Sequence, residues 1–295
     1  MQRRPAYQMI DGVARCVALN PDRLRKILQY TAKKGDLLQI TFPKSGTHWL
    51  MYIVQFILRN GQPMSTYQEF TKEWRFLEYM DIEKYNTSLP FRTFATHLEP
   101  NERTMTQDGK YIYLARNPWD VCVSFYHMVI NMRSYAFRDA TFEDFVDTFV
   151  SGNFGYGDYF QHVAAGFALK DEPNAGVLPG EEYGHTLEQD EALLQNLLER
   201  SQPDYMRNVA VLDLTGERNP QWNEVLSRLK VTISEDHNKY LLVRSGKVGS
   251  WKDYFTPGLL RKMENRILEA EKVSAFMDLW KDIRAEATAR MQNAQ

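Results

Sequence analysis

Short apolar runs and longer amphipathic stretches alternate along the first half of the chain. Runs at residues 37–42, 92–98 and 110–116 have the length and the β-branched or aromatic content of buried strands. After the first run, Asn60-Gly61 closes a helical pattern whose apolar face consists of Leu50, Ile53, Val54, Ile57 and Leu58. This stretch therefore predicts a strand, a loop and a helix in succession.

A second unit of the same kind follows the strand predicted at 110–116. Asn117-Pro118-Trp119-Asp120 interrupts the strand pattern, and residues 121–132 resume with a mostly apolar stretch of helix length. Repeated strand, loop and helix units favour an α/β fold, in which a central parallel sheet is flanked by helices. Ligands of such sheets gather at the carboxyl ends of the strands, so we expect both loops to open onto one edge.

The second half of the chain predicts mainly helices. Residues 139–169 contain two helical patterns separated by Ser151-Gly152-Asn153, and residues 171–186, rich in Pro, Gly and acidic side chains, predict a loop. Helical patterns return at 189–200 and from Pro257 to the C-terminus. No internal repeat is evident, and we expect a single domain over residues 1–295.

Composition and charge exclude several classes of protein. Hydrophobic residues make up 43% of the chain, as in an ordinary globular protein, and a net charge of −2 gives no positive field to attract nucleic acid or a membrane surface. No run of about twenty apolar residues predicts a membrane span. Cys16 and Cys122 have no paired spacing and indicate a reducing compartment, so we expect a cytoplasmic protein. The histidines lack metal-ligand spacing, and no metal is predicted.

The loop between the first predicted strand and helix has the residues of an anion site. Unpaired N–H groups at a helix start and the helix dipole attract phosphate or sulfate, and Gly46 lets the backbone approach closely. Ser45 and Thr47 add hydroxyl groups, and Lys44 adds a full positive charge. The loop lacks the GxxxxGK[ST] spacing of nucleotide triphosphatases, and an exposed turn with a solvated lysine is the alternative interpretation.

Two further loops carry positive charge. Arg116 ends the third predicted strand and Ser124 lies in the helix that follows, although a surface arginine and an ordinary helix serine also fit the pattern. Residues 244–252, RSGKVGSWK, form a basic loop with two glycines, which again suits phosphate. Three cationic loops in a chain of slightly negative charge point to one ligand with several phosphate groups.

Five segments of the chain resemble the cytosolic sulfotransferases. In order they are FPKSGTHW, ATHL, YLARNPWDVCVSFYH, FEDFVDTFVSGNFGYGDYFQHV and RSGKVGSWKDYFT, and the resemblance covers residues 35–170 and 181–280. It implies the P-loop-like sulfotransferase fold and the donor 3′-phosphoadenosine 5′-phosphosulfate (PAPS). The implied reaction is in-line transfer of the sulfuryl group to a hydroxyl or amine of a small phenol, amine or alcohol, with a histidine base and no metal.

The resemblance also implies roles for individual residues. His97, in the ATHL segment, matches the catalytic base, and an imidazole that titrates near neutrality suits this role; a histidine satisfied at a strand end is the alternative for an isolated residue. Lys44 is expected to stabilise charge on the leaving phosphate. The donor is expected to contact Lys44, Ser45, Gly46, Thr47 and His48 with its phosphosulfate, Trp49, Ser201 and Met206 with its adenine, and Arg116, Ser124, Arg244, Ser245 and Gly246 with its 3′-phosphate.

Two departures from the family pattern concern charge. Ala95 stands two residues before His97, where the family usually has a lysine, so the rate is expected to suffer. Ser245 stands where the family usually has a second cation, and Lys247 is a partial replacement. The family's dimer signature is also absent after Thr256, so the oligomeric state is left open.

A third departure lies between Leu169 and Glu181, where a core strand of the family is missing. A deletion, a splice form or an incomplete gene model would each produce this gap, which exposes the edge of the next strand and removes an adenine-contacting tyrosine. The strand-like segment 208–214, NVAVLDL, is a candidate to compensate.

Two rival functions stay open. Ala95 and the missing strand favour a weakly active or non-catalytic protein that binds PAPS or adenosine 3′,5′-bisphosphate (PAP). A nucleoside-phosphate kinase is a third hypothesis, against which stand the loop spacing and the lack of an obvious magnesium carboxylate. The sequence does not identify the acceptor, because the aromatic residues that could line its pocket fit a core equally well, namely Phe76, Tyr79, Phe137, Phe142 and Tyr240.

Overall fold

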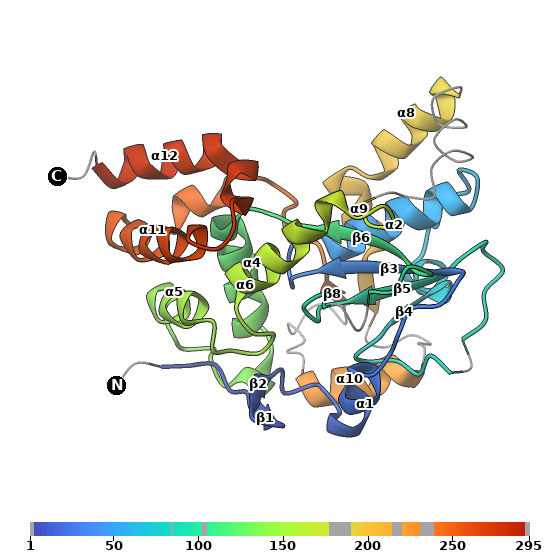
Figure 1. Cartoon of the computed structure of the whole chain (residues 1–295), viewed down its shortest axis with the longest axis horizontal. Coiled ribbons are helices and arrows are strands. Elements are labelled where there is room, and N and C mark those ends of the chain that lie inside the picture. Colours follow the sequence, from blue (N-terminus) through green and yellow to red (C-terminus); the bar gives the residue numbers. More distant parts are fainter. Residues whose placement is uncertain are drawn as a thin grey trace.

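A four-stranded parallel sheet forms the centre of the molecule (Figure 1). The computed structural model describes residues 3–83, 85–101, 105–176, 190–213, 220–230 and 239–292. The strands lie in the order β4-β5-β3-β6, with β4 at Trp74–Phe76, β5 at Arg92–Thr96, β3 at Asp36–Thr41 and β6 at Lys110–Leu114. The predicted α/β architecture is confirmed, and the short strand β4 was not predicted.

Strand β3 lies between β5 and β6 in the sheet, and every one of its residues is buried. Leu38 pairs in register with Phe94 of β5 on one side and with Tyr111 of β6 on the other. A strand covered on both faces needs a near-continuous apolar sequence, which the run at 37–42 supplies. The three strands that the sequence predicted are therefore adjacent, and their carboxyl ends lie at one edge.

Two helices leave this edge directly after β3 and β6. Helix α2 (Thr47–Leu58) begins behind Gly46, whose φ of 115° lies in the left-handed region that glycine tolerates. Helix α4 (Pro118–Ile130) begins behind Asn117, whose side chain caps it by accepting a hydrogen bond from the Asp120 N–H. Both helices were predicted from the apolar pattern.

The remaining helices cover the sheet and build a flank beside it. Figure 1 shows α11, α12 and α5 together on one side of the molecule, with α8 at the far side. Helices α5 and α6 are separated after Gly152, which ends α5 in a left-handed conformation, as the sequence predicted. The bounds are α1 Pro21–Ile27, α3 Tyr67–Lys72, α5 Phe142–Ser151, α6 Tyr159–Ala168, α8 Glu191–Arg200, α9 Pro203–Val209, α10 Pro220–Leu229, α11 Pro257–Glu271 and α12 Lys281–Gln292.

Short elements complete the described chain. Two antiparallel pairs are formed by β1 (Gln8–Ile10) with β2 (Val13–Arg15) and by β7 (Val211–Asp213) with β8 (Lys239–Leu241). Turns of 3₁₀ helix lie at Arg133–Tyr135, Leu169–Asp171, Ser250–Asp253 and Phe276–Trp280. In the portion of the chain that the structure describes, no helix has both the length and the hydropathy to cross a membrane.

Part of the segment in which the sequence predicted a missing strand lies beside β6. Tyr111 donates its N–H to the Asn174 carbonyl at 2.9 Å and accepts the Gly176 N–H at 2.9 Å, which makes a single parallel bridge to Ala175. The strand-like segment at 211–213 is a strand, but it pairs with β8 in a separate sheet, so it does not compensate at this edge. Residues 177–181 lie outside the described chain, and the internal deletion stays a prediction.

The core joins the sheet to the helical flank. Phe42, directly after β3, meets the rings of Phe125, Phe149 and Tyr159 edge to face, at centroid distances of 6.0, 6.3 and 5.2 Å. These rings belong to α4, α5 and α6, so one residue ties three helices to the end of the central strand. One buried apolar cluster extends from Ile10 to Ala287 and holds the strand ends in fixed positions.

Candidate active site

A cavity of about 720 Å³ lies at the carboxyl ends of β3, β5 and β6. We call it the carboxyl-end cavity. Its wall includes every site residue that the sequence predicted, which are Lys44, Ser45, Gly46, Thr47, His48, Trp49, His97, Arg116, Ser124, Ser201, Met206, Arg244, Ser245 and Gly246. The structure therefore brings together residues from five separate parts of the chain, and their individual roles stay predictions.

The loop at residues 43–49 has the backbone of an anion cradle. Lys44 and Gly46 both have positive φ, 71° and 115°, and the Ser45 N–H donates to the Phe42 carbonyl at 3.2 Å. A turn of this kind before a helix can present main-chain N–H groups to an anion. The Ser45 Oγ and the His48 Nε2 are buried and have no hydrogen-bond partner among the described residues. Buried polar atoms of this kind normally have a partner, so the loop has unused hydrogen-bonding capacity on the side of the cavity.

Positive charge in the cavity is not balanced at Lys44. Desolvation, and then the charges of Arg116 and Arg244, lower the pKa of Lys44 to about 8. A bound anion would stabilise the charged form of Lys44, because the anion offsets the repulsion from the half-buried Arg116 and the exposed Arg244. The residues present therefore fit a ligand that carries several phosphate or sulfate groups.

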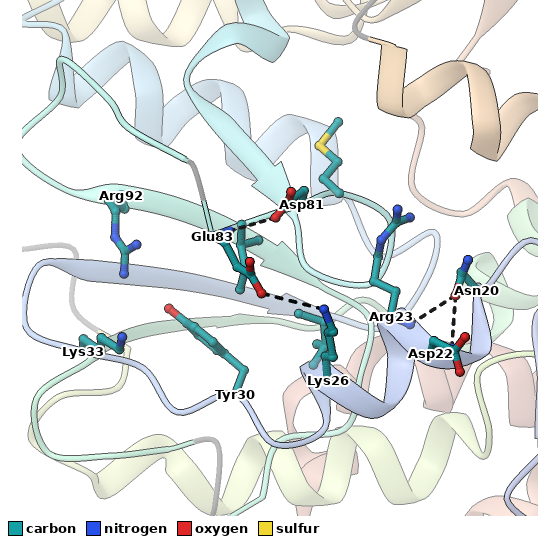
Figure 2. Close-up of a pocket in the computed structure, with 12 residues that line it drawn as sticks. Asn20, Asp22, Arg23, Lys26, Tyr30, Lys33, Asp81, Glu83 and Arg92 are labelled. Atoms are coloured by element: carbon teal, nitrogen blue, oxygen red, sulfur yellow. Dashed lines mark hydrogen bonds and ion pairs between the residues drawn. The ribbon is translucent and has the colours of Figure 1, made fainter.

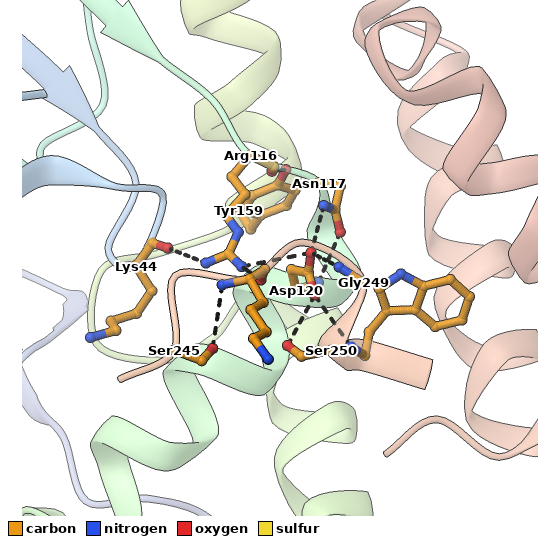
Figure 3. Close-up of polar contacts among 10 residues, drawn as sticks. Lys44, Arg116, Asn117, Asp120, Tyr159, Ser245, Gly249 and Ser250 are labelled. Carbon is orange, nitrogen blue, oxygen red and sulfur yellow. Dashed lines mark hydrogen bonds and ion pairs between the residues drawn. The ribbon is translucent and has the colours of Figure 1, made fainter. Parts of the chain in front are cut away.

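Arg116 connects the cationic loops through its guanidinium group (Figure 3). It donates hydrogen bonds to the Lys247 carbonyl at 2.9 Å and to the Lys44 carbonyl at 3.5 Å, and it lies 3.6 Å from the Asp120 carboxylate. The Tyr159 hydroxyl donates to the Arg116 carbonyl at 2.5 Å and fixes the backbone at the end of β6. The loops after β3 and β6 and the loop before the 3₁₀ turn at 250–253 are thus held against one another.

His97 follows β5 and lies at the cavity wall in a defined tautomer. Its Nδ1 lies 2.8 Å from the Thr41 carbonyl oxygen, which can only accept, so Nδ1 carries the hydrogen and Nε2 keeps its lone pair. Desolvation, followed by the charges of His162, His48 and Lys44, lowers the pKa of His97 to about 3. The imidazole is therefore neutral and has one nitrogen free to accept a proton.

Aromatic rings flank the imidazole of His97. Phe76 lies 4.8 Å from it and Tyr156 lies 5.4 Å from it, measured between ring centroids. The Tyr156 and Tyr79 hydroxyls hydrogen-bond to each other, which fixes the Tyr156 ring. Two of the proposed acceptor-pocket residues, Phe76 and Tyr79, therefore belong to the surroundings of His97.

The other aromatic residues considered for an acceptor pocket have different surroundings. Phe137 packs against Phe145, and Phe142 packs against Tyr254 and Phe255, in the helical flank. The side chain of Tyr240 lies outside the described part of the structure. Phe137 is thus a core residue, and Phe142 is half-buried against the core.

The opposite end of the cavity holds the residues expected at an adenine ring. Trp49 is 42% exposed, and its indole N–H donates to the Ser201 carbonyl at 2.9 Å. Met206, in α9, is fully buried beneath the cavity wall. A Cβ atom on Gly246 would lie 2.5 Å from Pro203 Cβ, so only glycine lets the loop at 244–248 approach α9 this closely.

Sequence reasoning missed three residues that organise the site. Asp120 was considered only as part of a strand-breaking segment, yet its buried carboxylate contacts Arg116. Glu78 was not considered, and its carboxylate accepts the main-chain N–H of His97 at 2.5 Å. Tyr156 was quoted only within a motif. A buried acidic residue three positions after the capping Asn117 is the one signal that could have indicated Asp120.

Ala95 and Ser245, which stand where the family usually has cations, differ in their positions. Ala95 is fully buried in β5, where it pairs in register with Gln39 and Phe76. Lys247 is exposed, and its carbonyl accepts from Arg116, while Ser245 lies on the cavity wall. A replacement of the missing cation by Lys247 stays a prediction.

A second cavity, of about 500 Å³, lies at the amino ends of β3 and β5 and is shown in Figure 2. We call it the amino-end cavity. Three of its four lysine and arginine side chains form ion pairs, Arg23 with Glu224 at 3.2 Å, Lys26 with Glu83 at 3.8 Å and Arg92 with Asp36 at 2.5 Å. Most of its positive charge is therefore balanced, and we propose that the functional site lies in the carboxyl-end cavity.

Comparison with known proteins gives matches over most of the chain. A family model described as "Sulfotransferase domain" matches residues 34–276. The chain is 30% identical to sulfotransferase 1B1 of Canis lupus familiaris over 244 residues, which cover 78% of this chain and 81% of the relative. It is 29% identical to a 3-alpha-hydroxysteroid sulfotransferase of Cavia porcellus over 253 residues, which cover 81% and 85%. The crystal structure of mouse sulfotransferase SULT7A1 complexed with PAP is similar at a TM-score of 0.61 and 20% identity, covering 96% of this chain and 99% of that one.

Proposed function

This chain belongs to the sulfotransferase family, and on that premise we propose that the carboxyl-end cavity binds PAPS and transfers its sulfuryl group to a small acceptor. The observation that carries the proposal is the convergence of Lys44, Arg116 and Arg244 with the neutral imidazole of His97 on one cavity. The first three suit the phosphates of a nucleotide donor, and the fourth suits an acceptor that must lose a proton.

The residues of the cavity divide between the two ends of the donor. We propose that the loop at 43–49 holds the phosphosulfate, that Arg116, Ser124 and the loop at 244–246 hold the 3′-phosphate, and that Trp49 stacks on adenine. A solved structure of the same fold is described as a PAP complex, which supports a nucleotide with phosphates at both positions. When bound, the donor supplies a sulfuryl group whose sulfur–oxygen bond to the 5′-phosphate breaks as the acceptor attacks sulfur.

His97 and Lys44 then have complementary tasks. The Thr41 carbonyl fixes the hydrogen on Nδ1 of His97, so Nε2 faces the acceptor as the base and takes its proton. Desolvation lowers the pKa of His97 to about 3, below the near-neutral value expected from the sequence, so the imidazole is neutral at physiological pH but a weaker base than a free histidine. Lys44 stabilises the negative charge that develops on the leaving phosphate oxygen.

We propose an acceptor with an apolar, ring-containing body next to its hydroxyl or amine. The rings of Phe76 and Tyr156 flank His97 and favour such a body by edge-to-face contact. One relative is named a 3-alpha-hydroxysteroid sulfotransferase, which supports the same class of acceptor. The cytoplasm is the proposed location, supported by two buried free thiols, Cys16 and Cys122.

The test is sulfuryl transfer from ³⁵S-labelled PAPS to a panel containing 4-nitrophenol, 2-naphthylamine and a hydroxysteroid. We expect labelled product with at least one acceptor, and a loss of kcat of about 10²- to 10⁴-fold in His97→Ala, because proton transfer to a positioned base contributes that much. The variant should still bind PAP as tightly as the unchanged protein, which separates catalysis from folding. Full turnover by His97→Ala would rule out its role as the base.

Ala95 favours a second candidate function, a protein that binds the nucleotide and turns over little or not at all. It places a methyl group in β5 at the position where the family usually has a cation. In the same assay, tight PAP binding without labelled product from any acceptor would support this second function.

A further inference from the structure

The carboxylate of Asp120 accepts four hydrogen bonds in addition to its ion pair with Arg116 (Figure 3). It is fully buried. Oδ2 accepts from the Gly249 N–H at 2.9 Å and from the Asn117 side-chain amide at 3.0 Å, and Oδ1 accepts from the Trp251 N–H at 3.2 Å and from the Ser250 hydroxyl at 3.3 Å. The guanidinium of Arg116 lies 3.6 Å from Oδ2.

Three of these donors come from a segment about 130 residues further along the chain, as the sequence separations of 129, 130 and 131 show. The segment from 244 to 249 has no regular secondary structure, and Gly246 and Gly249 have φ angles of 64° and 88°. Its position therefore depends on contacts with the rest of the chain, which include hydrogen bonds from Arg207 to the Ser245 carbonyl at 3.2 Å and from Arg116 to the Lys247 carbonyl at 2.9 Å. Asp120 makes the contacts at the carboxyl end, and the packing of Gly246 on Pro203 makes one near the amino end.

The same carboxylate also constrains Arg116. The guanidinium is shared between Asp120, the Lys247 carbonyl and the Lys44 carbonyl. Asp120 itself is not part of the cavity wall, whereas Arg116, Arg244, Ser245 and Gly246 are. Asp120 can therefore affect a ligand only through the groups that it holds.

We propose that Asp120 is a positioning residue for the 3′-phosphate of the donor, acting through Arg116 and the loop at 244–251. This inference rests on the proposed function of the cavity. Four N–H or O–H donors and a cation converge on two oxygens that only accept, so the isosteric amide would turn an NH₂ group toward N–H groups and leave buried donors unpaired. Arg116 and the loop at 244–251 would then lose their contacts with the carboxylate, whereas the loop at 43–49, which does not contact Asp120, would keep its conformation.

The experiment compares two ligands that differ only in the 3′-phosphate. Dissociation constants for PAP and for adenosine 5′-monophosphate are measured by titration calorimetry on the unchanged protein and on Asp120→Asn. We expect the variant to bind PAP about ten-fold or more weakly, the usual effect of losing a buried charge-assisted contact, and to bind the monophosphate within about three-fold of the unchanged protein. The preference for PAP over the monophosphate should therefore fall.

A matched control is available at the other end of the sheet. Asp36 is also a fully buried aspartate paired with an arginine, Arg92, but it lies at the amino-end cavity. Asp36→Asn should lower the melting temperature and leave the preference for PAP unchanged. If Asp120→Asn does not fold, Ser250→Ala removes one donor to the same carboxylate and should weaken PAP binding alone, by about two- to five-fold.

The possible results distinguish the proposed function of the cavity from the role of Asp120. An unchanged protein that does not bind PAP would overturn the proposed function and the role of Asp120 with it. Binding of PAP by the unchanged protein, with the same preference for PAP in Asp120→Asn or Ser250→Ala, would overturn the role of Asp120 alone. A purely structural Asp120 would weaken both ligands equally, which also contradicts the proposal.

Discussion

The Oε1 atom of Glu78 accepts a hydrogen bond from the main-chain N–H of His97 at 2.5 Å. Glu78 is fully buried, and its desolvation raises the pKa of the carboxyl group to about 7, although the hydrogen bond from His97 opposes this change. The residue that fixes the backbone of the proposed base thus changes its own charge near neutral pH. This relationship leads to the first prediction.

The unfolding free energy of Glu78→Gln, relative to that of the unchanged chain, should increase as pH rises from about 4.5 to about 7. In this window the unfolded carboxyl has lost its proton and the folded carboxyl still holds one, so stability that is present below pH 4.5 is lost as pH rises toward 7. The amide cannot titrate and should remove this loss, which is roughly 1 to 3 kcal/mol. The difference in unfolding free energy between the two proteins, from urea titrations at several pH values, measures it. A constant difference across the window would contradict it.

The protein should lose stability in acid through three histidines. Desolvation is the main cause that lowers the pKa of His48 to about 3, of His97 to about 3 and of His162 to about 4. Below pH 6.5 the unfolded chain binds protons at these sites and the folded chain does not, so stability falls as pH falls from about 6.5 toward 4. Each histidine contributes up to about 1.4 kcal/mol per pH unit. His97→Gln should reduce the slope by one proton, and an unchanged slope would show that His97 is protonated in the folded protein.

The affinity for PAP should decline above pH 8. Lys44 loses its proton near that pH because desolvation and two arginines lower its pKa, and a bound polyanion restores the proton. The dissociation constant should then rise by up to about ten-fold per pH unit above pH 8, and binding should take up a proton, which calorimetry in two buffers detects. Lys44→Arg keeps the charge at every accessible pH, so its affinity should not decline over this range. A parallel decline in both proteins would assign the effect to another group.

Gly246→Ala should disturb the site more than Gly249→Ala. Both glycines have positive φ, but a Cβ atom on Gly246 would lie 2.5 Å from Pro203 Cβ, whereas on Gly249 the nearest contact is Lys252 at 3.5 Å. The second substitution carries only the strain of the left-handed region, about 1–2 kcal/mol, while the first must also move the loop away from α9. We expect PAP affinity to fall about five- to thirty-fold more in Gly246→Ala, as one to two further kcal/mol would cause. Equal losses would show that the loop can shift without affecting the ligand.

Much of the sheet and of the candidate site could be predicted because the signals are local. The strand at 37–42 and the loop at 43–49 are contiguous, so their alignment follows from the chain itself. Strand β4 has three residues, and its place beside β5 depends on tertiary pairing rather than on an apolar pattern. The single bridge between Tyr111 and Ala175 is equally invisible in sequence, since one pair of hydrogen bonds requires no repeating pattern.

Asp120 and Glu78 could not be predicted from the sequence for one physical reason. Asp120 and Glu78 act by accepting hydrogen bonds from main-chain groups, and any residue type can supply a main-chain N–H. Neither the partner nor its distance along the chain is therefore encoded in a motif. Cationic loops around a glycine are different, because the side chains themselves carry the chemistry that the sequence displays.

The fluorescence of Trp49 should report on ligand binding in the carboxyl-end cavity. Three other tryptophans, Trp74, Trp119 and Trp251, are at most 1% exposed, so their fluorescence should respond little to a ligand in the cavity. Trp49 is 42% exposed and held by its hydrogen bond to Ser201 at the cavity wall. An adenine ring stacked on this indole would quench part of its emission and shield it from added iodide. Occupancy of the nucleotide end could then be followed in real time without a label, and without any turnover of the acceptor.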